Sequence, residues 1–195
     1  NVEPHERHLT DKPFNRYYLH SVDGFVYMSE QVHSELRAYS DAPALFSPHP
    51  LFENFGERVE RSEACVRLGL DPANRYVLFF GLIRDYKGLD LLLDAWAQLR
   101  RAGRTEGRRL IVAGGFYTAR EPYLNRIADN GLQDEVLLHD RFIPDDDVKY
   151  YFSAADFVVQ PYKTATQSGV TQIAYQFCVP MVVTDVGGLS EIVPD

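Results

Sequence analysis

The fold is decided by residues 76–99, which read YVLFFGLIRDYKGLDLLLDAWAQL. The first five form a continuous apolar run, as expected for a strand that is buried on both faces of a parallel sheet. A polar loop with glycines and cations follows, and the stretch from residue 89 onward has the spacing of an amphipathic helix. Four of its apolar residues fall on one side of that helix: Leu92, Leu93, Trp96 and Leu99. The stretch therefore predicts a strand, a loop and a helix.

The same alternation continues along the rest of the chain. Short apolar runs predict strands at 110–113, 136–138, 157–159 and 181–183, and the segments around them predict helices at 59–68, 123–130, 146–153 and 169–177. Alternating strands and helices imply right-handed crossovers and a parallel sheet with helices on both faces. The predicted fold class is α/β, a doubly wound, Rossmann-like parallel sheet. Its ligand should lie beyond the carboxyl ends of the strands.

The residues before this sheet follow another pattern. We expect short helices at 16–21 and 30–38, the second capped by Ser29, and strands at 25–28 and 44–46. Two prolines in the motif SPHP at 47–50 then force extended backbone. These prolines place a domain boundary or hinge between about Pro48 and Gly56, and divide the chain into domains at 1–50 and 51–195.

Composition limits the function classes. With 195 residues, a net charge of −8, 45% hydrophobic and 25% charged residues, the chain is typical of a globular protein that needs no disulfide or metal to hold its core. The negative charge argues against a nucleic-acid partner. Two cysteines, Cys65 and Cys178, fit a reduced, cytosolic compartment, and we expect Cys178 to pack among apolar residues.

The two ends of the sequence suggest part of a longer protein. The first residue is Asn1, and Pro194-Asp195 follows directly on a short helix-forming turn, so both ends look cut. We find neither a signal-peptide h-region nor an apolar run near the roughly 18 residues of a membrane span.

The loop between the first strand and helix of the deciding stretch is the first candidate site. It brings Gly81 and two cations, Arg84 and Lys87, to the carboxyl end of a strand and the start of a helix, where an anion is best held. The alternative is a solvated turn in which the cations pair with Asp85 or Asp90. The GxxxxGK[ST] order of a Walker A loop is absent.

Two further polar loops connect a strand to a helix. Thr164–Gly169 offers hydroxyls, a glycine and backbone N–H groups that could wrap phosphate oxygens, although Thr166 or Ser168 could simply cap the helix. The whole joint, from Gln160 to Ser168, is polar and longer than the roughly two to six residues that a strand-to-helix connection usually needs, which favours function. Val186–Glu191 contains paired glycines, which alone indicate a turn. Three such loops at one sheet edge together predict an anion-binding crevice.

Metal and dinucleotide sites are not expected. His5 and His8 lack a visible third ligand, and Asp145-Asp146-Asp147 follows Pro144, where acidic residues stabilise the first turn of a helix. No GxGxxG motif follows the first strand of the sheet, which argues against a nicotinamide dinucleotide.

Three segments then reveal a family resemblance. FFGLIRDYKGLDLLLDAWAQL at 79–99, AADFVVQPY at 154–162 and GVTQIAYQFCVPMVVTDVGGLSEIV at 169–193 resemble the carboxy-terminal donor domain of family-four retaining glycosyltransferases of the GT-B fold, over roughly 59–195. DGFVYMSEQVHSEL and SPHP resemble the end of the amino-terminal acceptor domain and its connection, most of that domain being missing.

The resemblance implies a nucleotide-diphosphate sugar as donor, UDP- or GDP-linked, with no other cofactor. Lys87 would meet the diphosphate with help from Arg84, although the family usually carries its arginine at the place of Leu82. Phe142 and Ile143 correspond to the segment whose backbone meets the base. The remaining donor-binding candidates are Gly81, Thr166, Gln167, Ser168 and Gly169, whose amides would face the diphosphate, and Gln172 for the ribose.

The implied activity is transfer of a hexosyl group, with retention of configuration, to a glycan or lipid-linked acceptor in polysaccharide or glycolipid biosynthesis. The resemblance implies a cytoplasmic protein. The missing domain could bring it into contact with the inner face of the membrane. This fragment alone is expected to be inactive. The family's pair of glutamates is replaced by Ala165 and Ile173. The alternatives are therefore a non-catalytic nucleotide or nucleotide-sugar binding module, or a scaffold.

Overall fold

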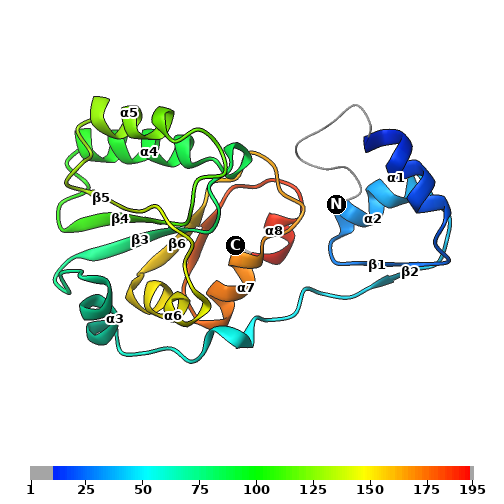
Figure 1. The fold of residues 1–195 in the computed structure, drawn as a ribbon, viewed down its shortest axis with the longest axis horizontal. Coiled ribbons are helices and arrows are strands. Elements are labelled where there is room, and N and C mark those ends of the chain that lie inside the picture. Colours follow the sequence, from blue (N-terminus) through cyan, green and yellow to red (C-terminus); the bar gives the residue numbers. More distant parts are fainter. Residues whose placement is uncertain (1–10, 194–195) are drawn as a thin grey trace.

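The computed structural model describes residues 11–193, which form two β-sheets (Figure 1). The larger sheet is parallel and has the order β5-β4-β3-β6-β7. Its strands are β3 (Arg75–Phe80), β4 (Arg108–Ala113), β5 (Val136–His139), β6 (Phe157–Gln160) and β7 (Met181–Val183). The expected α/β class, with a doubly wound parallel sheet, is confirmed.

The strand order creates a switch point beside β3. The chain moves outward from β3 to β4 and β5, then returns to pair β6 with the other side of β3. Leu78 accordingly pairs with Ile111 of β4 and with Val158 of β6. Since the connection after β3 leads toward β4 and the connection after β6 leads toward β7, in opposite directions across the sheet, a crevice is expected between the carboxyl ends of β3 and β6.

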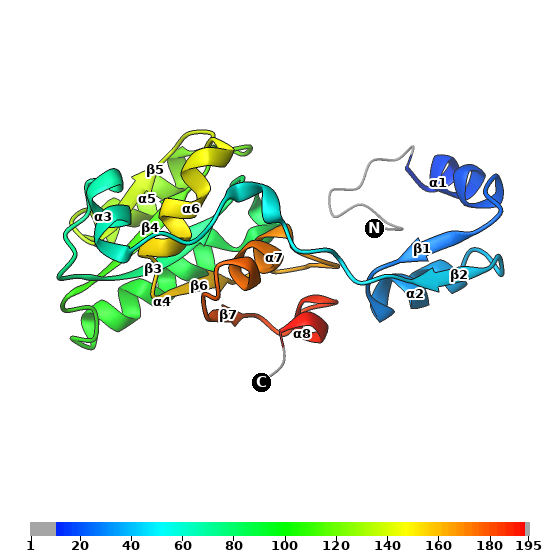
Figure 2. The same cartoon turned by 90° about the horizontal axis from the view of Figure 1, so that it is seen from below.

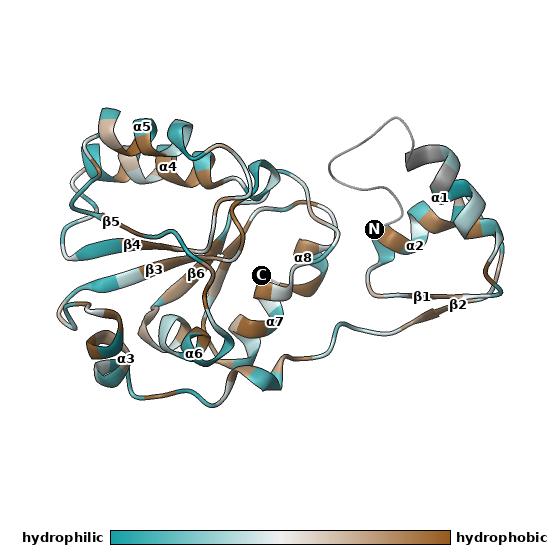
Figure 3. Ribbon diagram, viewed as in Figure 1, coloured by the Kyte–Doolittle hydropathy of each residue, from teal (hydrophilic) through white to brown (hydrophobic). Residues whose placement is uncertain are grey.

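Helices cover both faces of the larger sheet (Figures 1 and 2). α4 (Leu89–Arg101) and α5 (Glu121–Asp129) pack on one face, and α3 (Arg61–Leu68), α6 (Asp145–Ala154) and α7 (Gly169–Gln176) pack on the other. Along β3 and β4 the sequence changes from polar to apolar where the strands run between the helix layers (Figure 3). α4 buries Leu92, Leu93 and Trp96, whereas Leu99, in the last turns of the helix, is 40% exposed.

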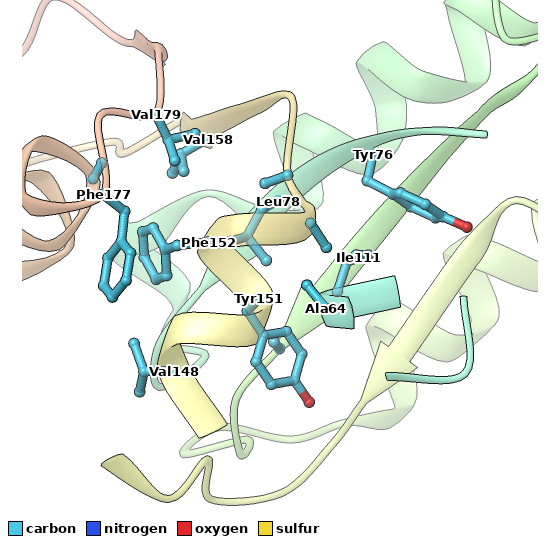
Figure 4. Packing of buried hydrophobic residues seen from close by; sticks show 14 of the residues in the cluster. Ala64, Tyr76, Leu78, Ile111, Val148, Tyr151, Phe152, Val158, Phe177 and Val179 are labelled. Atoms are coloured by element: carbon cyan, nitrogen blue, oxygen red, sulfur yellow. The ribbon is translucent and has the colours of Figure 1, made fainter. Parts of the chain in front are cut away.

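The core on the α6 side is rich in aromatic rings. Tyr151 and Phe152 of α6 are fully buried, and the ring of Phe152 stacks on that of Phe177 with 5.6 Å between centroids (Figure 4). They pack against apolar side chains of the sheet, including Leu78 and Val158. This layer fixes the end of α7 against the sheet, and so fixes where α7 begins.

The segment before the larger sheet contains α1 (Asp11–His20), β1 (Phe25–Tyr27), α2 (Glu30–Arg37) and β2 (Ala44–Phe46), with β1 and β2 paired in parallel. Ser29 caps α2 as expected, its side chain accepting a hydrogen bond from the Val32 amide at 3.4 Å. An extended connection with one 3-10 turn, η1 (Glu53–Phe55), leads to α3. The division into domains at 1–50 and 51–195 stays a prediction.

Several smaller expectations can be compared with the structure. Cys178 is exposed rather than packed, which corrects its sequence interpretation. α6 begins at Asp145, so the three aspartates do occupy a first helical turn. His5 and His8 lie outside the described residues. None of the helices within residues 11–193 combines the length and the apolar character that crossing a bilayer requires.

Candidate functional site

The three loops singled out in the sequence meet at the carboxyl edge of the larger sheet. The amide of Lys163 donates to the carbonyl of Tyr86 at 2.7 Å, joining the loop after β6 to the loop after β3. A Cβ at Gly88 would overlap the carbonyl oxygen of Pro161, and Cβ atoms at Gly187 and Gly188 would overlap those of Ala165 and Thr166. The glycines therefore allow three backbones to approach closely at this edge.

Lys87 lies at the centre of this edge. It ends the 3-10 turn η2 (Asp85–Lys87), which Gly88 terminates in the left-handed conformation with φ +69°. A Cβ at Gly81 would lie 3.1 Å from Nζ of Lys87, and the ring centroid of Tyr162 lies 5.9 Å from it. Burial, and secondarily the charge of Arg84, lowers the pKa of Lys87 to about 8. Within residues 11–193 no carboxylate forms an ion pair with this ammonium group.

The nearby aspartates pair with another lysine. Nζ of Lys163 lies 3.0 Å from Oδ1 of Asp85 and 3.0 Å from Oδ2 of Asp90. Burial lowers the pKa of Lys163, but its hydrogen bonds to the two carboxylates outweigh that effect and raise it. The alternative interpretation, in which Arg84 and Lys87 pair with Asp85 or Asp90, is therefore wrong for Lys87. Lys163 was not among the residues that sequence reasoning selected.

Arg84 lies against a fourth loop that the sequence analysis did not single out. Its guanidinium carbon is 3.8 Å from the ring centroid of Tyr117, in the loop after β4. Ile83 ties the two loops together, because its amide donates to Gly115 and its carbonyl accepts from Tyr117, both at 2.9 Å. Arg84 is thus held on an aromatic face near Lys87, a geometry suited to a cation that contacts a ligand.

The beginning of α7 supplies backbone amides beside Lys87. Ser168 has the extended backbone of an N-cap, yet its side chain makes no capping bond and lies 3.2 Å from the hydroxyl of Tyr162. Burial raises the pKa of Tyr162 to about 12, so this hydroxyl stays neutral. The first amides of a helix lack intrahelical acceptors. A Cβ at Gly81 would lie 3.6 Å from Cγ2 of Val170, which places Gly81 between the first turn of α7 and Lys87.

The other proposed donor-binding residues occupy different environments. Gln172 and Thr166 are each 5% exposed, and Gln167 is half-buried. Phe142 is 75% exposed and follows β5, where a Cβ at Gly115 would lie 3.9 Å from its backbone nitrogen. Ile143 is buried in the core on the α6 side. The structure therefore places Phe142 beside the loop that carries Tyr117.

The positions of the family's glutamate pair lie in apolar surroundings. Ala165 is 3% exposed and Ile173 is 6% exposed, so both are buried. Across residues 11–193, we find no group of three or more His, Cys, Asp or Glu side chains that could hold a metal ion. The groups present at the edge suit an anion: one largely buried ammonium group, a guanidinium stacked on an aromatic ring, and helix amides.

Comparison with known proteins identifies the family to which this chain belongs. Residues 74–195 match the family described as Glycosyl transferases group 1. The lipopolysaccharide core biosynthesis mannosyltransferase LpsB of Rhizobium meliloti is 36% identical over 164 residues, which cover 80% of this chain and 44% of that protein. A D-inositol 3-phosphate glycosyltransferase of Segniliparus rotundus is 35% identical over 140 residues, covering 70% of this chain and 30% of its own length.

Solved structures share the fold. HepE of Anabaena, in complex with UDP and glucose, superposes with a TM-score of 0.78 at 18% identity, covering 100% of this chain and 53% of that one. Sucrose-phosphate synthase of Thermosynechococcus elongatus gives 0.77 at 23% identity, covering 94% and 46%. The chain spans less than half the length of the two sequence relatives. With the match to residues 74–195, the chain belongs to the group 1 glycosyl transferases and has the GT-B fold.

Proposed function

We propose that this chain carries the donor site of a glycosyltransferase that moves a hexosyl group from a UDP- or GDP-linked sugar to a glycan or lipid-linked acceptor. The observation that carries the proposal is the environment of Lys87. Its ammonium group is largely buried, it pairs with no carboxylate among residues 11–193, and it lies beside Gly81 and the first turn of α7. A buried cation with no anion of its own is suited to receive one from a ligand.

The donor diphosphate would lie between Lys87 and the amides of Thr166–Gly169, with Arg84 at its side. The bond from the anomeric carbon to the β-phosphate oxygen breaks, and a bond from the acceptor oxygen forms on the same face of the sugar, so configuration is retained. The departing phosphate oxygen takes the acceptor proton, and no protein nucleophile is needed. Lys87, Arg84 and the α7 amides stabilise the negative charge that grows on the leaving diphosphate.

The nucleoside would extend toward the loop after β5. There the exposed Phe142 and the backbone of Ile143 would meet the base, and Gln172 would bond the ribose. The buried hydroxyl of Tyr162 stays neutral beside Ser168, so it adds no charge that would repel a diphosphate. This arrangement assigns the diphosphate to the β3–β6 switch point and the nucleoside to the β4–β5 side.

The names of the relatives support the rest of the proposal. LpsB is named as a mannosyltransferase of lipopolysaccharide core biosynthesis, and the HepE structure holds UDP and glucose. We therefore propose a sugar nucleotide as donor and a surface glycan or its lipid-linked precursor as acceptor, in the cytoplasm at the inner face of the membrane. Acceptor contacts would come largely from parts of the protein outside this chain.

A non-catalytic nucleotide-sugar binding module is the second candidate. Ala165 and Ile173 favour it, since both are buried apolar residues at the positions of the family's glutamates. Transfer by the full-length protein would exclude this alternative. Hydrolysis or transfer measured with UDP- and GDP-linked hexoses is the direct assay.

The test of the donor site is calorimetric titration of this chain with UDP and with GDP. We expect one nucleotide to bind, and Lys87→Ala to weaken that binding at least tenfold, about 1.4 kcal/mol. Lys149→Ala is the matched control, because Lys149 lies in α6 and stacks on Tyr150, away from the switch point. Equal nucleotide affinities of the wild-type chain and the Lys87→Ala variant would show that Lys87 does not bind the diphosphate.

A further inference from the structure

Glu191 joins the two ends of the described chain. Its carboxylate accepts hydrogen bonds from the amides of Glu30 at 2.8 Å and Gln31 at 3.2 Å, one on each oxygen. These are the first two amides of α2, which have no acceptor within their own helix. A carboxylate at this end also interacts favourably with the helix dipole. Glu191 belongs to α8 (Leu189–Ile192), which follows the last strand of the larger sheet, so the contact links the α1–β2 segment to the end of residues 51–193, called the larger domain below.

The turn formed by Gly187 and Gly188 packs beside this contact and also against the loop that precedes α7, at the proposed donor site. A Cβ at Gly188 would lie 3.0 Å from Oγ of Ser29, the N-cap of α2, and would also overlap the carbonyl oxygen of Thr166. A Cβ at Gly187 would overlap the side-chain oxygen of Gln31. The turn is therefore packed between the beginning of α2 and the loop that precedes α7.

We propose that Glu191 is a positioning residue that holds the segment 11–46 in one place relative to the β3–β6 edge. Its two carboxylate oxygens bind the first two amides of α2. The Gly187–Gly188 turn beside it packs against both the beginning of α2 and the Thr166 backbone, so the position of α2 is fixed relative to that backbone. The importance of this position for catalysis rests on the proposed function. The positioning itself is a property of the contact and needs no ligand.

Glu191 is not what holds α8 in place. The hydroxyl of Tyr175, in α7, donates to the carbonyl of Ile192 at 2.5 Å, and Leu189 is fully buried. α8 is therefore attached to the larger domain by contacts that do not involve the Glu191 carboxylate. Variants at Glu191 are expected to keep the fold and to change only the contact with α2.

The test uses a matched pair of variants at Glu30. Glu30→Pro deletes the amide that donates to Glu191, yet proline suits the first position of a helix. The preceding Ser29 already has the extended backbone, φ −148° and ψ 150°, that proline requires before it. Glu30→Ala removes the same side chain, including its ion pair with His33, but keeps the amide. The two variants therefore differ in the hydrogen bond to Glu191.

The measurement is the distance between spin labels on the exposed residues Ser34 of α2 and Ser62 of α3, each changed to Cys. Cys178→Gly removes the exposed native thiol, and Cys65 is buried. We expect Glu30→Pro and Glu191→Ala to broaden the distance distribution at least about twofold, as the segment samples more positions. Glu30→Ala should leave it narrow, as should Glu106→Ala, a change in an exposed loop before β4.

Two results would overturn the positioning role: an unchanged distribution in Glu191→Ala, or equal broadening in Glu30→Pro and Glu30→Ala. Thermal unfolding of the larger domain should be the same in all variants, which separates positioning from stability. The distances are measured without nucleotide. If neither UDP nor GDP binds while the distributions behave as expected, the donor proposal fails and the role of Glu191 stands.

Discussion

Gly81 leaves room for the ammonium group of Lys87, because a Cβ at Gly81 would lie only 3.1 Å from Nζ. Gly81 also has φ +100°, a conformation that other residues rarely adopt. Two independent constraints therefore require glycine at the end of β3. The contact with Lys87 belongs to the site and the positive φ belongs to the turn, so the two constraints can be separated by substitution.

Gly81→Ala should impair anion binding as well as stability. The new methyl group would lie 3.1 Å from Nζ of Lys87 and must shift the ammonium group, so we expect the nucleotide affinity to fall at least tenfold, about 1.4 kcal/mol. Gly69→Ala is the control, since Gly69 has φ +68° with nothing within 4 Å of an added Cβ. It should lower the free energy of unfolding by roughly 1 kcal/mol and leave affinity unchanged. Calorimetric titration and urea unfolding measure both effects.

Nucleotide affinity should depend on pH through Lys87. With a pKa of about 8, Lys87 is protonated at pH 7 and loses its charge as the pH rises through 8. Affinity should therefore fall between pH 7 and 9.5, by up to about tenfold per pH unit above 8. Lys87→Arg is the comparison, because arginine keeps its charge throughout this range. A wild-type affinity that stays constant up to pH 9.5 would contradict the assignment.

Lys87→Met should stabilise the domain at neutral pH. The pKa of Lys87 is about 8 in the folded protein and 10.5 ordinarily, so between these values the unfolded chain binds more protons and the free energy of unfolding rises with pH. Below pH 8 the buried charge destabilises the fold, on the order of 2 to 3 kcal/mol. We expect Lys87→Met to gain that amount at pH 7 and nothing at pH 10.5. Urea unfolding across this range, compared with Lys149→Met, provides the measurement.

The sequence predicted the parts of this architecture that depend on local pattern. The apolar runs of β3 and β6 and the Ser29 cap were all recognisable, because burial and capping follow from neighbouring residues. The strand order was not predicted, since it depends on pairings between distant segments. For the same reason Tyr117 and Lys163 were missed: Lys163 meets Asp85 across 78 residues, and a single lysine or tyrosine carries no local signal for such a contact.

Lys163 is expected to matter through the charges it neutralises. Oδ1 of Asp90 is buried and has no hydrogen-bond partner among residues 11–193, so Lys163 is what compensates this carboxylate. Lys163→Met should lower the free energy of unfolding by about 1 to 2 kcal/mol, because it leaves a partly buried charge unpaired. Adding Asp90→Asn should recover at least half of the loss. Purely additive effects in this double-mutant cycle would show that the two residues are not coupled.

Cys178 ends α7 in a conformation that favours glycine. It has φ +51°, and the amides of Cys178 and Val179 donate to the carbonyls of Tyr175 and Ala174, the hydrogen-bond pattern of a Schellman motif. Cys178→Gly should therefore raise the free energy of unfolding by about 1 kcal/mol, since the strain of a side chain in this region is removed. Cys178→Ala keeps the strain and should give no such gain. Equal stabilities of the Gly and Ala variants in urea would mean that the side chain, rather than the backbone conformation, determines the energy at this position.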